Sequence, residues 1–257
     1  MKIELDAAKS VEENAAHYFE MAKTARRKLE GAKAALEVTK KKLANLEHDM
    51  EKKKQEIIAK AVPKRKREWF ERFRWLYSSE GFLIVAGRDA TTNEVVVKKH
   101  CDAGDLVFHC ELPGSPFAVI KSQGKEIGKK TIEETAQFVA CFSKGWKAGR
   151  SLVDVYYVKP EQVTKEAPAG EYISKGSFMI YGRKTSLTVP LKLFIGKMED
   201  GRVMAGPKEA ILANCKASLE LSQGDMKPSE AAKKIRVALA TDDIDEIIKT
   251  IPVGTKA

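Results

Sequence analysis

The chain has 257 residues, of which 43% are hydrophobic and 32% charged, so it is long enough to bury a core without disulfide cross-links. Its four cysteines stand singly, with no Cys-x-x-Cys pair, which argues against a disulfide-rich secreted scaffold and favours a reduced, cytoplasmic protein. The first residues indicate no signal peptide, and no apolar run approaches the length of a membrane span. The net charge of +10 suggests an acidic partner, although a basic protein need not contact nucleic acid specifically.

The first predicted element is one long helix over about residues 6–60. Apolar and small side chains recur there at alternating spacings of three and four, and mostly Lys, Arg and Glu lie between them. A seam sustained well beyond three heptads predicts a coiled-coil helix of about 75–80 Å. No second heptad helix of matching length follows, so the helical partner for residues 7–60 is expected in another chain or in a segment missing here. A plain dimerising coiled coil is the alternative.

The helix is expected to end at Pro63, because the residue before a proline is biased away from helical geometry. We therefore predict two domains, a coiled-coil helix over residues 1–62 and a second domain over residues 63–257. A basic run follows the proline and leads into an aromatic segment over residues 69–77 that is predicted to be helical. Alternating cations and rings suit a phosphate backbone and exposed bases. For Phe70, Phe73 and Leu76, a core-facing role is favoured instead.

Beyond residue 81 the pattern changes to short strands, turns and small helices. The expected strands and strand pairs are 82–86 with 94–98, 106–110 with 117–121, and 153–158, 177–181 and 187–195. The expected helices are 131–145, with Thr131 as its N-cap, then 207–215, 229–240 and 244–251. These elements lack a regular β-α-β alternation, so we predict an α+β fold: a compact domain of mixed sheet and helix, preceded by the long heptad helix.

Several motifs carry a family resemblance. They are Phe70-x-x-Phe-Arg-Trp-x-x-Ser-Ser-x-Gly-Phe-Leu83, Gly87-Arg-Asp-Ala90, Val97-Lys-Lys99, Gly104-Asp105, Phe108-His109, and the segments 164–172 and 176–182. In this order they resemble the NFACT-R domain, and residues 11–33 are similar to the second coiled-coil arm of the same family.

The resemblance implies an RNA-binding module of a ribosome quality control factor. Its expected partners are the large ribosomal subunit with its rRNA, and tRNA or peptidyl-tRNA. Full-length NFACT proteins begin with an NFACT-N domain and a helix-hairpin-helix module, which this sequence lacks, so we expect a fragment, a split-gene partner or a stand-alone variant. The family commonly has a second histidine where Pro113 stands between His109 and Gly114, which argues against a role for two imidazoles and favours a rigid turn.

The candidate RNA-binding residues form an expected basic rim that would accept phosphates. They are Lys64, Arg65, Lys66, Arg67, Arg88, Asp89, Lys98, Lys99, His109, Lys121, Gly176, Ser177, Arg183 and Lys184. Lys98, Lys99 and Lys121 are expected on neighbouring strands. Two alternatives remain open: Arg88 and Asp89 could simply stabilise a turn, and Gly176-Ser177 could either cradle an anion or mark the entry of a strand.

Nothing in the sequence favours catalysis. Strand alternation would send His109 and Cys110 to opposite faces, and no spacing matches a common zinc site, a nucleophile elbow or a Walker loop. We therefore predict a non-catalytic RNA- or ribosome-binding module without metal or cofactor. The alternatives are a coiled-coil adaptor, which dimerises or joins a separate NFACT-N-type protein, and a metal-dependent hydrolase that uses His109.

Overall fold

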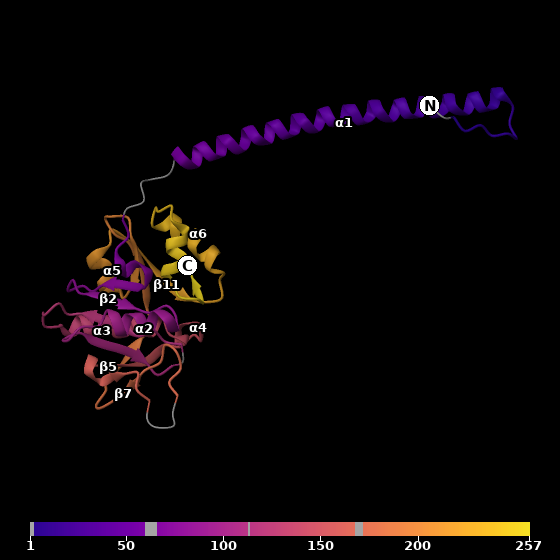
Figure 1. Ribbon diagram of the computed structural model, residues 1–257. Coiled ribbons are helices and arrows are strands. Elements are labelled where there is room, and N and C mark those ends of the chain that lie inside the picture. Colours follow the sequence, from indigo (N-terminus) through magenta and orange to yellow (C-terminus); the bar gives the residue numbers. More distant parts are fainter. Residues whose placement is uncertain (1–2, 60–65, 113, 168–171) are drawn as a thin grey trace. The chain divides into compact units, whose positions relative to one another are not determined.

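The computed structural model describes residues 3–59, 66–112, 114–167 and 172–257 (Figure 1). The chain divides into two compact units, residues 1–66 and 67–257, and each is described by itself. The domain boundary predicted after residue 62, the helix end at residue 60 and Pro63 lie outside the described residues.

The first unit is built on one helix, α1 (Val11–Ala59), which confirms the long heptad element. The helix begins five residues later than predicted, because Ser10 and Glu13 form reciprocal capping contacts of 3.1 and 2.8 Å. The residues before it fold back along the helix (Figure 1), where Asn14 accepts a hydrogen bond from the Asp6 amide at 2.9 Å.

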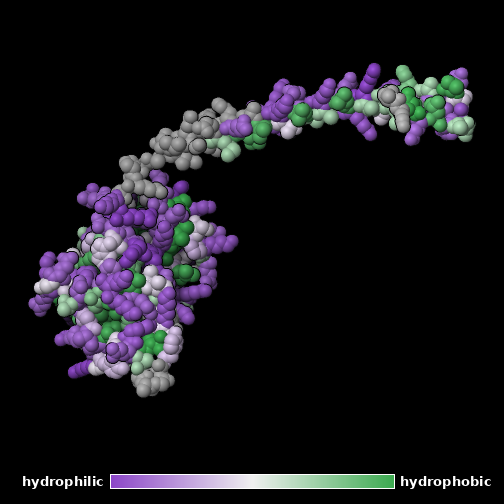
Figure 2. Space-filling view, viewed as in Figure 1, coloured by the Kyte–Doolittle hydropathy of each residue, from purple (hydrophilic) through white to green (hydrophobic). Residues whose placement is uncertain are grey.

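The apolar seam of α1 is exposed. Leu29, Leu36, Leu43 and Leu46 each expose more than half of their surface, and Figure 2 shows hydrophobic residues spread among hydrophilic ones along this helix. Within the first unit, therefore, no described residue covers these four leucines.

The second unit contains a six-stranded antiparallel sheet with the order β1-β2-β4-β3-β5-β8. Its strands are β1 (Arg74–Tyr77), β2 (Leu83–Ala86), β3 (Leu106–Cys110), β4 (Ala118–Lys121), β5 (Leu152–Val158) and β8 (Thr185–Pro190). Helix α3 (Lys129–Cys141) packs against β3, β5 and β8, and Phe138 of this helix joins Phe108 of β3 among the largest fully buried side chains.

A smaller antiparallel sheet has the order β10-β9-β11-β12, and a two-stranded ribbon pairs β6 with β7. The strands are β9 (Leu193–Lys197), β10 (Val203–Gly206), β11 (Ala217–Gln223), β12 (Thr255–Lys256), β6 (Val163–Thr164) and β7 (Met179–Ile180). The remaining helices are α2 (Ala90–Lys99), α4 (Lys144–Lys147), α5 (Lys208–Asn214), α6 (Pro228–Ala238) and α7 (Ile244–Thr250), with 3-10 turns η1 (Trp69–Arg72) and η2 (Pro160–Gln162). Antiparallel sheets combined with separate helices confirm the α+β class.

Two predicted elements were wrong near the motif residues. Residues 94–98 lie in α2 rather than in a strand, because Asp89 caps a helix whose buried residues Asn93 and Val96 are three positions apart. Strand β2 pairs instead with β1 and β4. The aromatic segment is not one helix but η1 followed by β1, although Phe70 and Leu76 are buried as expected.

Other differences lie farther along the chain. The strand predicted over residues 187–195 is two strands, β8 and β9, in separate sheets, because β8 ends at Pro190. Helix α3 begins after Gly128 rather than at Thr131. Thr131 is buried and donates its hydroxyl to the Glu80 carboxylate at 2.6 Å, so its polar group is satisfied away from the helix end.

Candidate nucleic-acid interface

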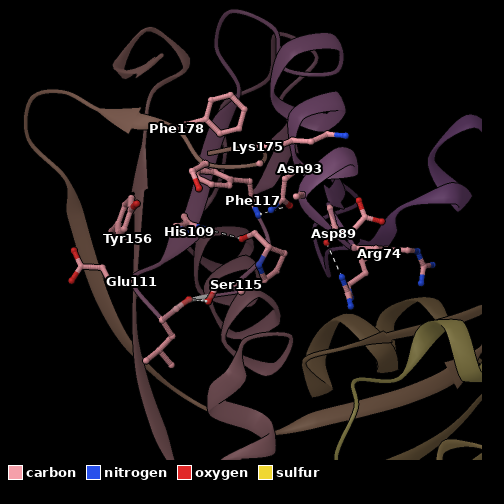
Figure 3. A pocket seen from close by; sticks show the side chains of 18 residues that line it. Arg74, Asp89, Asn93, His109, Glu111, Ser115, Phe117, Tyr156, Lys175 and Phe178 are labelled. Atoms are coloured by element: carbon pink, nitrogen blue, oxygen red, sulfur yellow. Dashed lines mark hydrogen bonds between the residues drawn. The ribbon is translucent and has the colours of Figure 1, made fainter. Parts of the chain in front are cut away.

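A pocket of about 540 Å³ opens where three segments distant in sequence meet (Figure 3). The first segment joins the end of β2 to the start of α2, the second is the β3–β4 turn, and the third is the loop over residues 175–178. Five predicted site residues line this pocket: Arg88, Asp89, His109, Gly176 and Ser177.

The floor of the pocket is fixed by Asn93 of α2. Its side-chain carbonyl accepts a hydrogen bond from the Phe117 amide at 3.1 Å, which ties α2 to the segment that enters β4. Only glycine fits beside it at position 87, since a Cβ there would lie 2.0 Å from Asn93 Oδ1. The Gly87-Arg88-Asp89 motif therefore sets the path of the chain from β2 into α2.

Arg88 lines the pocket, but its guanidinium mainly stabilises the fold through hydrogen bonds to the backbone. Its guanidinium donates to the carbonyl oxygens of Arg72 (3.2 Å), Phe73 (2.8 Å) and Lys249, and burial lowers its pKa although nearby Asp89 opposes this. Asp89 accepts a hydrogen bond from the Thr92 amide at 2.8 Å, which lowers the Asp89 pKa and caps α2. The geometry thus agrees with the turn-stabilising alternative for this pair.

Arg74 is a pocket residue that the sequence analysis missed. Its Nη1 donates to the Gly87 carbonyl at 2.8 Å, whereas its buried Nε has no hydrogen-bond partner among the described residues. Burial, together with the nearby charge of Arg88, lowers the Arg74 pKa to about 10. An arginine at the start of the otherwise apolar strand β1 was the available signal.

One wall of the pocket is aromatic. The rings of His109 and Phe117 stack at 3.9 Å and 4°, and Phe178 meets Phe117 edge-on at 5.1 Å. The Nδ1 of His109 lies 3.1 Å from the Pro116 carbonyl, so Nδ1 carries a proton and Nε2 is left as an acceptor. Burial lowers the pKa of His109, which keeps this ring neutral near neutral pH.

The loop that carries Gly176 is fixed to α2 through Glu94. Glu94 accepts from Lys165 at 2.8 Å and from the Gly176 amide at 3.1 Å, and these two bonds lower its pKa to about 2. Gly176 has a φ of +80°, and a Cβ there would lie 2.4 Å from the Cα of Ala90. The Gly176 amide already donates to Glu94, which argues against the anion-cradle alternative for Gly176-Ser177.

Cations stand at the rim of the pocket. Lys175 is exposed and lines the opening. The Lys184 ammonium lies 4.4 Å from the centroid of the Tyr156 ring and 3.4 Å from the Glu111 carboxylate. Arg183 is exposed next to Lys184, and its carbonyl accepts from Gln162.

The other predicted cations do not line this pocket. Lys98 and Lys99 are exposed in the last turn of α2 rather than on a strand. Lys121 lies on β4, but its side chain is only 10% exposed and forms ion pairs with Asp102 and Asp105, so its charge is already neutralised. In the basic run, Lys64 and Arg65 lie outside the described residues, as does Pro113, whereas Lys66 and Arg67 are exposed.

Across the described ranges, no three or more His, Cys, Asp or Glu side chains come together in a way that could hold a metal ion. Likewise, none of the described helices is both long and apolar enough to cross a membrane.

Comparison with known proteins places the pocket in a defined domain. Residues 72–182 match the family described as the NFACT protein RNA binding domain. The chain is 37% identical over 74% of its length to the archaeal Rqc2 homolog aRqcH of Methanocaldococcus jannaschii, and covers 29% of that protein. It is 35% identical to the ribosome quality control complex subunit NEMF homolog of Drosophila melanogaster and 35% identical to NEMF of Homo sapiens, over 77% and 71% of its length.

The chain spans 29%, 20% and 17% of the lengths of these three relatives. Among solved structures, it resembles the C-terminal part of the fibronectin/fibrinogen-binding protein from Streptococcus suis, with a TM-score of 0.40 and 21% identity over 51% of this chain and 48% of that one. The resemblance seen in the sequence motifs is confirmed: residues 72–182, which include all the residues that line the pocket, match the NFACT protein RNA binding domain.

Proposed function

We propose that the chain is a non-catalytic RNA-binding module of a ribosome quality control factor, and that the pocket is its main RNA contact. In the cytoplasm it would bind rRNA or tRNA on large ribosomal subunits that carry peptidyl-tRNA. The observation that carries this proposal is convergence: motif residues from positions 88–89, 109 and 176–177 meet around one pocket in a domain of an RNA-binding family.

The chemistry of the pocket favours an unpaired nucleotide. An aromatic wall that includes Phe178 offers a face or edge to a base, and the Nε2 of His109 is an acceptor for a base amino group. Lys175, which lines the opening, is placed for a flanking phosphate. Lys184, which lies over the Tyr156 ring, would exchange its ion pair with Glu111 for a second phosphate. Such a site reads shape and charge more than sequence.

The direct test is binding of labelled single-stranded RNA to the full chain, measured by fluorescence anisotropy. Removal of one stacking ring by Phe178→Ala should weaken binding by about 1–3 kcal/mol. Lys129→Ala serves as the control, because Lys129 begins α3 and its side chain is 88% exposed away from the pocket lining. Equal affinities for the wild type and for Phe178→Ala would contradict the proposed site.

A second candidate function, a helical adaptor, is favoured by the exposed seam of α1. Leu36 and Leu43 expose 55% and 57% of their surfaces, as expected for positions that bury against another helix. A seam variant, Leu36→Glu with Leu43→Glu, should abolish self-association or capture of a partner helix in analytical ultracentrifugation. The matched variant Lys40→Glu, on the charged face, should not. A wild-type chain that sediments as a monomer would remove the homodimer version.

A further inference from the structure

A stack of one indole and one imidazole lies at the C-terminal end of α2, outside the pocket lining. Trp69 of η1 and His100, which follows α2, have ring centroids 4.3 Å apart and planes 17° from parallel. Trp69 is 42% exposed, whereas Trp75 and Trp146 are 8% and 1% exposed. With His100 against one face of Trp69, much of the remaining indole surface is open to solvent.

The stack is held in place by its neighbours. Phe70 and Phe73 meet Trp69 edge-on, with centroids 5.8 and 6.3 Å away, which fixes the plane of the indole. Arg72 Nη2 lies 3.1 Å from His100 Nε2. Since a guanidinium can only donate, His100 accepts this bond and carries its own proton on Nδ1. The ring is therefore neutral, in agreement with a pKa that burial and the nearby Arg72 charge both lower.

The surroundings of the stack are cationic rather than apolar. Arg72, Lys98 and Lys99 are all exposed, and Lys99 is adjacent to His100 in the chain. Lys121 donates to the His100 carbonyl at 2.9 Å, but its charge is balanced by Asp102 and Asp105, and Lys98 forms an ion pair with Glu94 at 3.5 Å. Arg72 and Lys99 therefore supply most of the net positive charge beside the stack. A protein partner would be expected on a broader apolar patch. An exposed ring beside the exposed cations Arg72 and Lys99 suits a base with its phosphates.

We propose that the open face of Trp69 is a second RNA contact, the Trp69 platform, which stacks one unpaired nucleobase while Arg72 and Lys99 bind the adjacent phosphates. This inference rests on the proposed RNA-binding function, but it uses none of the residues that line the pocket. Because every base has a π face, the platform would tolerate any sequence but would select single-stranded over paired RNA.

The exposed position of Trp69 among three tryptophans supplies the test. The full chain is titrated with a short oligouridylate, and intrinsic tryptophan emission is recorded together with the anisotropy of a label on the RNA. Stacking should quench the emission, and the quenching should saturate at the same RNA concentration as the anisotropy. Trp69→Phe should abolish the quenching and keep most of the affinity, and Trp69→Ala should weaken binding roughly 5- to 100-fold.

The outcomes separate the platform from the general function. Binding by anisotropy with unchanged tryptophan emission would overturn the platform and leave RNA binding by the pocket intact. Absence of any anisotropy change would overturn both. Trp69→Phe keeps a ring in the stack, so this variant stays informative even where Trp69→Ala unfolds the domain. A titration with duplex RNA should give little quenching, and equal quenching by duplex would contradict base stacking.

Discussion

The two ends of α2 use the same kinds of cationic side chain differently. At the N-terminal end, Arg74 and Arg88 are largely buried and donate to backbone carbonyls, so their charges hold the chain in place. At the C-terminal end, Arg72, Lys98 and Lys99 are exposed around an open aromatic stack. A basic motif residue can therefore stabilise the fold or bind a ligand, and its burial and hydrogen-bond partners decide which.

The largest expected effect comes from the packing at the N-terminal end. In Gly87→Ala the new Cβ would overlap Asn93 Oδ1 and lie 2.7 Å from the backbone nitrogen of Asn93. It would therefore break the hydrogen bond that Asn93 Oδ1 accepts from the Phe117 amide. The free energy of unfolding should fall by about 3 kcal/mol or more, measured by urea denaturation. Gly31→Ala in α1 is the control, since its Cβ meets nothing within 4 Å. Full stability of Gly87→Ala would show that this turn can move freely.

Arg88→Met should separate the structural from the binding role. It keeps the aliphatic stem but leaves the carbonyls of Arg72, Phe73 and Lys249 without their donor, which should lower the free energy of unfolding by about 2–4 kcal/mol. Lys99→Met should change stability by less than about 0.5 kcal/mol and instead weaken RNA binding. The opposite pattern, with Arg88→Met stable but defective in RNA binding, would reverse the assignment of the two ends.

Acid should destabilise the second unit through its two histidines. Burial lowers the pKa of His100 and of His109 in the folded protein. In the unfolded chain both histidines have the ordinary pKa of about 6.5, so on acidification the unfolded chain binds protons before the folded protein does. The stability that these groups provide is therefore complete above about pH 6.5 and is lost as pH falls through their folded pKa values. Urea denaturation from about pH 7 to pH 5 should show the decline. His109→Asn, which can still donate to the Pro116 carbonyl, should flatten part of it. A constant stability over this range would contradict the burial of both rings.

The smallest expected effect is on the salt dependence of RNA binding. Each of Lys98→Ala and Lys99→Ala should reduce the slope of log affinity against log salt by about one where the lysine neutralises a phosphate. Lys233→Ala, an exposed lysine on α6, is the matched control. An unchanged slope for both variants would exclude these lysines from the interface.

Much of the fold could be predicted from local patterns. The heptad spacing predicted α1, and short strand patterns predicted the β3–β4 pair. Helix patterns predicted the small helices near the C-terminus. The run Val95-Val96-Val97 was misleading, because β-branched residues favour strands while the cap at Asp89 and packing on the sheet select a helix. The separation of β8 from β9 depends on two different sheets, which no local pattern records.

The candidate site was predictable where motif residues and structure coincide. Arg88, Asp89, His109, Gly176 and Ser177 converge on the pocket as a group. Which charged side chains are already ion-paired within the fold was not predictable, because the sequence does not show whether a charged side chain is buried. Lys121 is neutralised by two aspartates whose contacts depend on the folded turn. Phe117 and Phe178 were missed because they fall in the predicted strands 117–121 and 177–181, where an apolar ring is expected in the core.

Both proposals place RNA at two aromatic sites, the pocket and the Trp69 platform. The most direct test is ultraviolet cross-linking of the full chain to single-stranded RNA that contains 4-thiouridine, followed by peptide mass spectrometry. We expect cross-links at Trp69 and at Phe178, with few on α6 and α7. Cross-links confined to α1 or to the C-terminal helices, with none at either aromatic site, would contradict both proposals.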